Sequence, residues 1–312
     1  MLRRFRFLPG SIALSLGCSS IEDAGSVALS RDTRHPLEVY AWREGADGAY
    51  QRDPAPLARG LSSLHPVLHD GEVWTPVLQS IREPTWLEEV FPALRVAFLT
   101  SGDGRSWRYR VARVDAPGHS LIDPAFVEGP EGLELWFVQH DAEGDPAHAQ
   151  GSVRVLRTRW RGASFGDAEV WWTGSTVLDP APVHDGARWR VFATQGIDVV
   201  ELAPDGRSAP VLSGATVPWA FHDADGVGLL AQRLTDGKML PIVVRPGVAG
   251  WTAEPVALRM DAASQGTRTC ASPGIVAIAG GRTLLCVDET QAHGGHSADG
   301  GARRGDAGRP SN

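Results

Sequence analysis

The sequence is poor in several features that define common protein classes. Its 312 residues include only three cysteines and three methionines, which is too few cysteines for a disulfide scaffold or a cysteine-rich metal site. Beyond the first 18 residues, no apolar run approaches the ~20 residues that span a bilayer. A basic stripe interleaved with aromatic residues is also missing, and the net charge is -7. Nucleic acid is therefore not an expected partner.

The chain also lacks the patterns of helical folds. No sustained 3.6-residue hydrophobic period occurs, and strands do not alternate with helices long enough for parallel crossovers. Hydrophobic residues nevertheless make up 42% of the chain and charged residues 21%, which is enough apolar matter for a folded core. These observations favour an all-β protein.

One hairpin-like unit occurs five times along the chain. Each copy has a residue followed by proline, a few apolar residues, a turn and an apolar strand; the copies start at His65, Asp123, Asp179, Val217 and Ser272. Four of the copies carry a turn pair that supplies the positive φ of tight hairpin turns, namely Asp70-Gly71, Asp185-Gly186, Asp225-Gly226 and Gly280-Gly281. Each unit is therefore predicted to be a β-hairpin.

A second hairpin type alternates with the first, and it also occurs five times. Four strands per repeat, with 38 to 58 residues from one repeated proline to the next, are typical of propeller blades. We therefore predict a five-bladed β-propeller over residues 37–288. Its last blade would combine a C-terminal hairpin near 272–288 with an N-terminal hairpin near 37–57, because closing the ring removes exposed sheet edges.

The N-terminus has the organisation of a targeting segment. Three arginines precede a short apolar stretch that ends in Gly17-Cys18, and this end resembles a bacterial lipoprotein signal, in which the cysteine is lipidated. A plain cleaved secretory signal is the alternative. The resemblance implies lipidation at Cys18 and a location at the bacterial cell envelope, facing the periplasm or the exterior, with the lipid as the only membrane contact.

The boundaries follow from these segments. We expect a signal at 1–18, a linker at 19–36, the propeller at 37–288 and a disordered tail at 289–312, which lacks apolar residues able to pack. A short helix is predicted near Pro84, where Thr85 and Glu88 form a capping box. Cys270 and Cys286 are either a disulfide, which an oxidising compartment allows, or two buried small hydrophobic residues.

The repeats place five side chains together. If each unit begins with its innermost strand, the residue before each proline lies near the propeller axis at one rim, below the long connections around residues 80–93 and 139–152. His65, Asp123 and Asp179 are the chemically active members of this set. The alternative for the aspartates is structural, because an Asp before Pro can bond nearby backbone N–H groups.

The Asp-Pro openings, above all Ile122-Asp123-Pro124-Ala125-Phe126, and the turn Ser101-Gly102-Asp103-Gly104-Arg105-Ser106-Trp107 resemble five-bladed glycoside hydrolases of the arabinanase and β-xylosidase type. The resemblance covers about residues 37–288 and implies three axial carboxylates: a base, a residue that tunes the acid, and the acid. Asp123 matches the tuning residue. His65 stands where the base is expected and Asp179 stands near the acid, so the catalytic set is incomplete. Glu128-Gly129-Pro130 echoes the string around the acid but falls in a hairpin turn at the opposite rim.

Three further residues are candidates for substrate binding: Trp86, His140 and Trp219. Both tryptophans could stack on a sugar face or could pack in the core. The acidic loop that begins at His140 has no calcium-loop spacing, so no metal and no cofactor are expected.

Two functions remain open from the sequence. The first is a monomeric envelope lipoprotein whose propeller binds carbohydrate, with hydrolysis by His65, Asp123 and Asp179 left undecided. The second is a non-catalytic scaffold or protein-binding propeller, because one fold hosts many functions.

Overall fold

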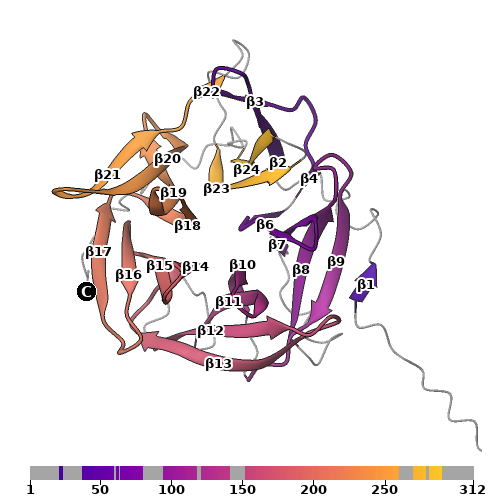
Figure 1. Ribbon diagram of the computed structural model, residues 1–312, viewed down its shortest axis with the longest axis vertical. Helices are drawn as coiled ribbons and strands as arrows, with labels where there is room; N and C mark the ends of the chain where they lie inside the picture. Colours follow the sequence, from indigo (N-terminus) through magenta and orange to yellow (C-terminus); the bar gives the residue numbers. More distant parts are fainter. Residues whose placement is uncertain are drawn as a thin grey trace, which may run out of the picture.

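Five antiparallel sheets surround a central axis in the computed structural model, which describes residues 21–23, 37–59, 61–62, 64–79, 94–117, 121–140, 152–259, 270–278 and 281–289 (Figure 1). Every regular element in these ranges is a β-strand, so the prediction of an all-β five-bladed propeller is confirmed. None of the described segments forms an apolar helix of membrane-spanning length. The helix expected near Pro84 lies outside the described residues, as does the tail expected at 289–312 apart from Glu289, which is the last residue of strand β24.

The strands of each blade are given from the innermost to the outermost. Blade 1 contains β6 (Val67–His69), β7 (Glu72–Gln79), β8 (Arg95–Ser101) and β9 (Arg108–Arg113). Blade 2 contains β10 (Ile122–Gly129), β11 (Gly132–His140), β12 (Val153–Trp160) and β13 (Phe165–Gly174). Blade 3 contains β14 (Leu178–His184), β15 (Trp189–Gln195), β16 (Asp198–Leu202) and β17 (Ser208–Ser213). Blade 4 contains β18 (Thr216–Asp223), β19 (Gly226–Thr235), β20 (Lys238–Gly247) and β21 (Gly250–Pro255).

Blade 5 draws its strands from two distant parts of the chain. The inner pair is β23 (Ala271–Ile278) and β24 (Gly281–Glu289), and the outer pair is β2 (Leu37–Glu44) and β3 (Tyr50–Arg52). Strand β2 pairs antiparallel with β24 from Leu37 opposite Glu289 to Arg43 opposite Thr283. An ion pair of 2.9 Å between Arg52 and Asp288 joins the two parts again.

Short strands extend two of these sheets, those of blades 1 and 5. They are β1 (Ile21–Asp23) on β9, β4 (Ala58–Arg59) on β2, β5 (Leu61–Ser62) on β7 and β22 (Leu258–Arg259), which runs parallel to β3. Strand β1 falls within 19–36, the segment expected as a linker, so three residues of that segment pair with the outer edge of blade 1.

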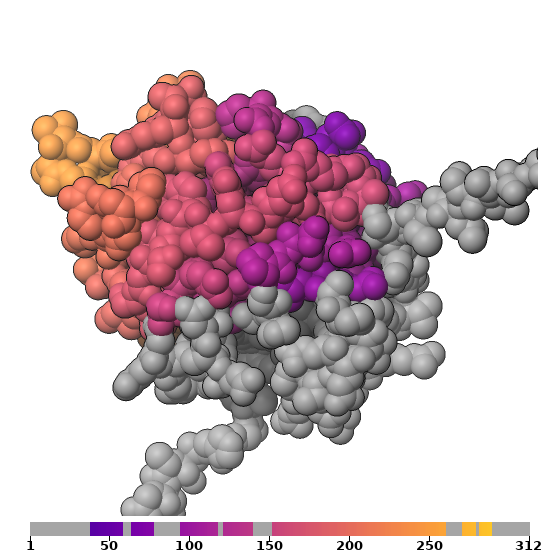
Figure 2. Space-filling model, turned by 90° about the horizontal axis from the view of Figure 1, so that it is seen from below, coloured from indigo at the N-terminus to yellow at the C-terminus, as the bar shows by residue number. Residues whose placement is uncertain are grey.

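The hydrophobic core is divided among the five seams between neighbouring blades. Each seam holds its own cluster of buried side chains contributed by the two blades that meet there. Between blades 1 and 2, for example, the rings of Trp74 and Phe98 stack at 4.9 Å and both contact Phe126. Because each blade packs against both of its neighbours, the sheets are buried only when the ring is complete. Seen edge-on, the outer strands β12 and β13 cover one side of a thick disc (Figure 2).

The two late cysteines lie at the seam between blades 4 and 5. Cys270 and Cys286 form a disulfide with their Cα atoms 4.9 Å apart, and both residues are buried. Of the two sequence interpretations, the structure therefore shows the disulfide, which fastens the start of β23 to its partner strand β24.

Gly274→Ala tests the seam between blades 5 and 1. A Cβ at residue 274 would overlap the ring of Pro66 and lie 3.1 Å from the carbonyl oxygen of Leu64. We expect the substitution to lower the free energy of unfolding by about 1–3 kcal/mol, as overpacking does. Gly281→Ala is the matched control, because a Cβ there meets no atom within 4 Å. Chemical denaturation measures both, and equal stabilities of the two variants would contradict the tight seam.

Candidate functional site

The two ends of the propeller axis differ in structure. We call the end at which each innermost strand begins the loop rim; the connections from one blade to the next lie there. The opposite end is the turn rim, where hairpin turns such as 130–131 and 224–225 join the innermost strand to the second strand. The sequence prediction places the residues before the repeated prolines at the loop rim.

Four of the five innermost strands start with the same irregularity. The residue before the proline has a left-handed backbone, and the pairing with the second strand shifts at that point: φ is 47° at Asp123, 52° at Asp179, 50° at Val217 and 46° at Ser272. A left-handed backbone is unfavourable for such residues by about 1–3 kcal/mol, most clearly for β-branched valine. Each β-bulge must therefore be held by contacts from outside its own strand.

The neighbouring blade provides these contacts. A bulged residue leaves the strand pairing, so its N–H needs another acceptor. In three cases a side chain of the preceding blade accepts it: Asp179 N–H to Asp123 Oδ2 at 3.2 Å, Val217 N–H to Thr194 Oγ1 at 2.8 Å, and Ser272 N–H to Gln232 Oε1 at 2.7 Å. Blades 2 to 5 are thus linked in sequence around the loop rim.

Asp123 and Asp179 form a carboxyl pair within this arrangement. Burial raises the pKa of Asp123 to about 6, although the hydrogen bond from the Asp179 N–H favours its ionised form. Burial and the nearby charge of Asp123 raise the pKa of Asp179 well above its usual range, against a hydrogen bond with the Thr194 hydroxyl. The buried pair therefore keeps a proton to a higher pH than free aspartates do, and this proton belongs to the pair as a whole. Such a pair can accept and donate hydrogen bonds side by side.

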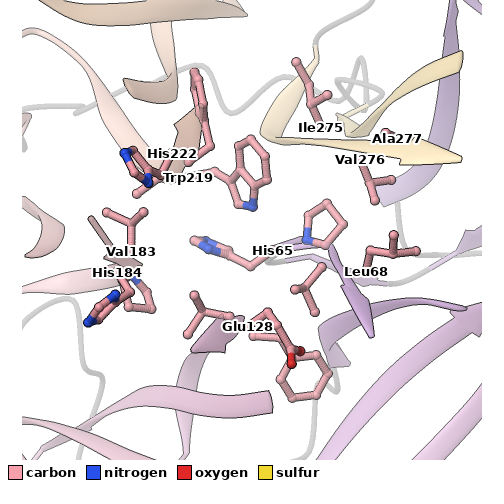
Figure 3. A pocket seen from close by; sticks show the side chains of 17 residues that line it. His65, Leu68, Glu128, Val183, His184, Trp219, His222, Ile275, Val276 and Ala277 are labelled. Carbon is pink, nitrogen blue, oxygen red and sulfur yellow. The ribbon is translucent and has the colours of Figure 1, made fainter. Parts of the chain in front are cut away.

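His65 departs from the other four positions. It has no positive φ, and its strand β6 begins two residues later with Val67 opposite Trp74. Its side chain is 2% exposed, and burial lowers its pKa to about 4. The imidazole lines a cavity on the axis that neither aspartate lines (Figure 3). The structure thus brings Asp123 and Asp179 together, and no contact in its described part joins His65 to either of them.

The residues predicted to bind substrate do not lie together in one described site. Trp219 is half-buried in β18, lines the same axial cavity as His65 and stacks on Phe221 at 5.5 Å. His140 is the last residue of β11, and its side chain lies outside the described residues, as do Trp86 and Cys18. Glu128 lies beside the turn at the end of β10, at the turn rim, where its Oε2 is 3.0 Å from His69 Nδ1.

Thr194 and Gln232 are site residues that the sequence interpretation did not select. Both are polar residues inside apolar strands, are 6% and 8% exposed, and lie opposite Leu178 and Thr216 at equivalent positions of β15 and β19. Aligning the second strands of the hairpins would have exposed this repeated polar position. Within the described ranges, no group of three or more His, Cys, Asp or Glu side chains could hold a metal ion.

Comparisons with known proteins find similarity in fold but not in sequence. No protein-family model matches the chain, and no curated protein is significantly similar to it. A mutant form of the GH43 protein BlXynB from Bacillus licheniformis matches with a TM-score of 0.52 and 9% identity, over 72% of this chain and 48% of that one. An alpha-L-arabinofuranosidase from Lactobacillus brevis matches with a TM-score of 0.51 and 10% identity, over 75% of this chain and 86% of that one.

This chain spans about half the length of the first of these structures. The matches confirm that the fold resembles the glycoside hydrolase type of propeller. At such low identity they carry no information on individual residues, so the chemistry of the site rests on its own geometry.

The raised pKa values predict a pH dependence that Asp179→Asn should change. Because the folded chain holds protons on the carboxyl pair that the unfolded chain has lost, the pair's contribution to stability is complete below about pH 4 and declines as pH rises. We expect the free energy of unfolding of Asp179→Asn, relative to the unmodified chain, to rise between pH 4 and pH 8, because the variant no longer loses this contribution as pH rises.

At each pH, the free energy of unfolding of Asp179→Asn must be compared with that of the unmodified chain. His65 acts in the opposite direction, because its lowered pKa makes stability rise between about pH 4 and pH 6.5, and this contribution cancels when the variant is compared with the unmodified chain. Asp225→Asn, at an exposed turn, serves as the control. A stability difference for Asp179→Asn that stays constant across this pH range would show that the carboxyl of Asp179 is not perturbed.

Proposed function

We propose that the chain binds carbohydrate at the loop rim, with the carboxyl pair of Asp123 and Asp179 as its anchor. The observation that carries the proposal is the hydrogen bond between the two residues together with their raised pKa values. Carboxyl groups with perturbed pKa values cluster at functional sites. The alpha-L-arabinofuranosidase with the same fold, which acts on a sugar substrate by its name, supports carbohydrate as the ligand class.

The pair suits the chemistry of sugar hydroxyl groups. A hydroxyl both donates and accepts hydrogen bonds. When the pair holds one proton, its ionised carboxyl accepts a hydrogen bond from one hydroxyl, while its protonated carboxyl donates one to a neighbouring hydroxyl. Since the Asp179 N–H engages only Oδ2 of Asp123, Oδ1 of that carboxylate is left for a ligand. Hydrogen bonds to a charged group contribute about 1.5–3 kcal/mol each.

Binding, rather than hydrolysis, is the function that the geometry supports best. Hydrolysis of a glycosidic bond requires one carboxyl group to donate a proton and a second group across the bond to activate water. The raised pKa values of the carboxyl pair suit the role of proton donor. His65, at the position that the resemblance assigns to the base, is buried and lines the axial cavity instead. Release of reducing sugar from a bound glycan would therefore show catalysis in addition to binding.

We also propose that the protein is exported and held at the cell envelope through a lipid on Cys18. The support is the sequence itself, in which a basic stretch and a short apolar stretch precede Gly17-Cys18. Anchoring at the envelope would expose the propeller to external glycans.

Asp123→Asn tests the carbohydrate site. A glycan array with the chain from Ser19 onward first identifies a bound sugar, and calorimetric titration then gives its dissociation constant. We expect Asp123→Asn to weaken binding about 10- to 100-fold, because the charge-assisted hydrogen bond is lost. The melting temperature should stay the same, because the amide oxygen of asparagine can still accept the Asp179 N–H.

Asp225→Asn is the matched control, as the same substitution at an exposed position of the turn rim. Its dissociation constant should equal that of the unmodified chain. A strongly destabilised Asp123→Asn with unchanged sugar affinity would make Asp123 a structural residue, and the absence of any bound glycan would reject the site altogether.

Cys18→Ser tests the tether. The thiol that would carry the lipid is removed, so the variant should leave the membrane fraction or accumulate as an unprocessed precursor. Cell fractionation after labelling with radioactive palmitate measures both. A chain with native Cys18 that stays with membranes but takes up no label would contradict the lipid anchor.

A further inference from the structure

A cavity of about 430 Å³ lies on the propeller axis, toward the turn rim. The innermost strands of all five blades line it, and Figure 3 shows their side chains converging from several directions. Thirteen of its 17 lining residues are apolar or aromatic. Small-molecule sites are typically concave and mostly apolar, with volumes of about 300–1,000 Å³. The size and the composition of this cavity fit such a site.

The deepest polar group of the cavity is His65. It precedes β6, at the end of that strand remote from the turn rim, and its imidazole points toward the middle of the cavity, beside Trp219 (Figure 3). No hydrogen bond to this 2% exposed side chain occurs within the described part of the chain. Burial keeps the imidazole neutral, with a pKa of about 4. A buried neutral histidine offers one N–H and one free nitrogen lone pair, and such groups normally have partners.

The electrostatics of the wall restrict the ligand. Lysine and arginine are absent from the lining residues, so an anion would find no counter-charge there. The single lining carboxylate, Glu128, lies at the mouth beside His69. The remaining polar lining residues, His184 and His222, also lie next to hairpin turns. A polyhydroxylated ligand would therefore leave most of its hydroxyl groups against apolar walls, without partners.

We infer that this cavity binds a small, neutral aromatic molecule that carries one hydroxyl group. Its ring packs against Trp219, Phe221 and the aliphatic wall, and its hydroxyl group donates a hydrogen bond to the free nitrogen of His65. The site lies toward the rim opposite to the carboxyl pair and shares no residue with it. The test of this cavity is therefore independent of the test of carbohydrate binding.

The test uses 2-naphthol, which is planar, neutral at pH 7 and carries one hydroxyl group, in titrations followed by ligand-observed NMR. We expect saturable binding with one site per chain. Ala277 is exposed and lines the cavity, whereas Ala224 is exposed in the β18–β19 turn of the same rim and does not line it. Ala277→Trp should block the cavity and weaken binding at least tenfold, and Ala224→Trp should leave it unchanged.

His65→Phe separates the hydrogen bond from the apolar contacts. It should weaken 2-naphthol about fivefold, the loss expected for one neutral hydrogen bond, and leave the affinity for naphthalene within twofold of the unmodified chain. Absence of saturable 2-naphthol binding, or equal binding to Ala277→Trp and the unmodified chain, would overturn the site. An equal loss of both ligands in His65→Phe would overturn the role of His65. If that variant does not fold, the comparison of Ala277→Trp with Ala224→Trp decides the proposal.

Discussion

A buried backbone N–H that has left its strand must find an acceptor, and the blades of this propeller depend on one another for that acceptor. The residue before each repeated proline in blades 2 to 5 is bulged out of its sheet. For Asp179, Val217 and Ser272, the N–H is accepted by a side chain of the preceding blade. An unsatisfied buried N–H costs about 1–3 kcal/mol, so each of these bonds links the conformation of one blade to the position of the next.

The acceptor differs between seams, and this difference creates the candidate site. In blades 3 and 4 it is the neutral side chain of Thr194 or Gln232. The equivalent position of β11 is Val138, which lies opposite Ile122 and has no acceptor. The carboxylate of Asp123 takes that role instead. A group that can ionise is thereby buried next to a second aspartate, so the structural need for an acceptor produces two carboxyl groups with raised pKa values.

The same bulge separates the two ends of the axis. At Asp123, where it is present, the carboxylate bonds the neighbouring blade at the loop rim. Where it is absent, at His65, the side chain lines the axial cavity among apolar residues. One end of the axis therefore concentrates charge, and the other is apolar with a single deep polar group. Ligands of different chemistry are expected at the two ends, because charge and apolar surface select different partners.

The sequence by itself determined the class of fold and the number of blades. Alternating hairpins with a proline at a repeated position are local signals, and each hairpin forms largely from residues close in the chain. The repeat also placed Asp123 and Asp179 at equivalent positions of adjacent blades. Only the tertiary structure decided the left-handed backbone at Val217, which local preference opposes, and the direction of the His65 side chain. The pKa shifts of the two aspartates belong to this second group, because burial and the proximity of residues 56 positions apart arise from packing between blades and from no local pattern.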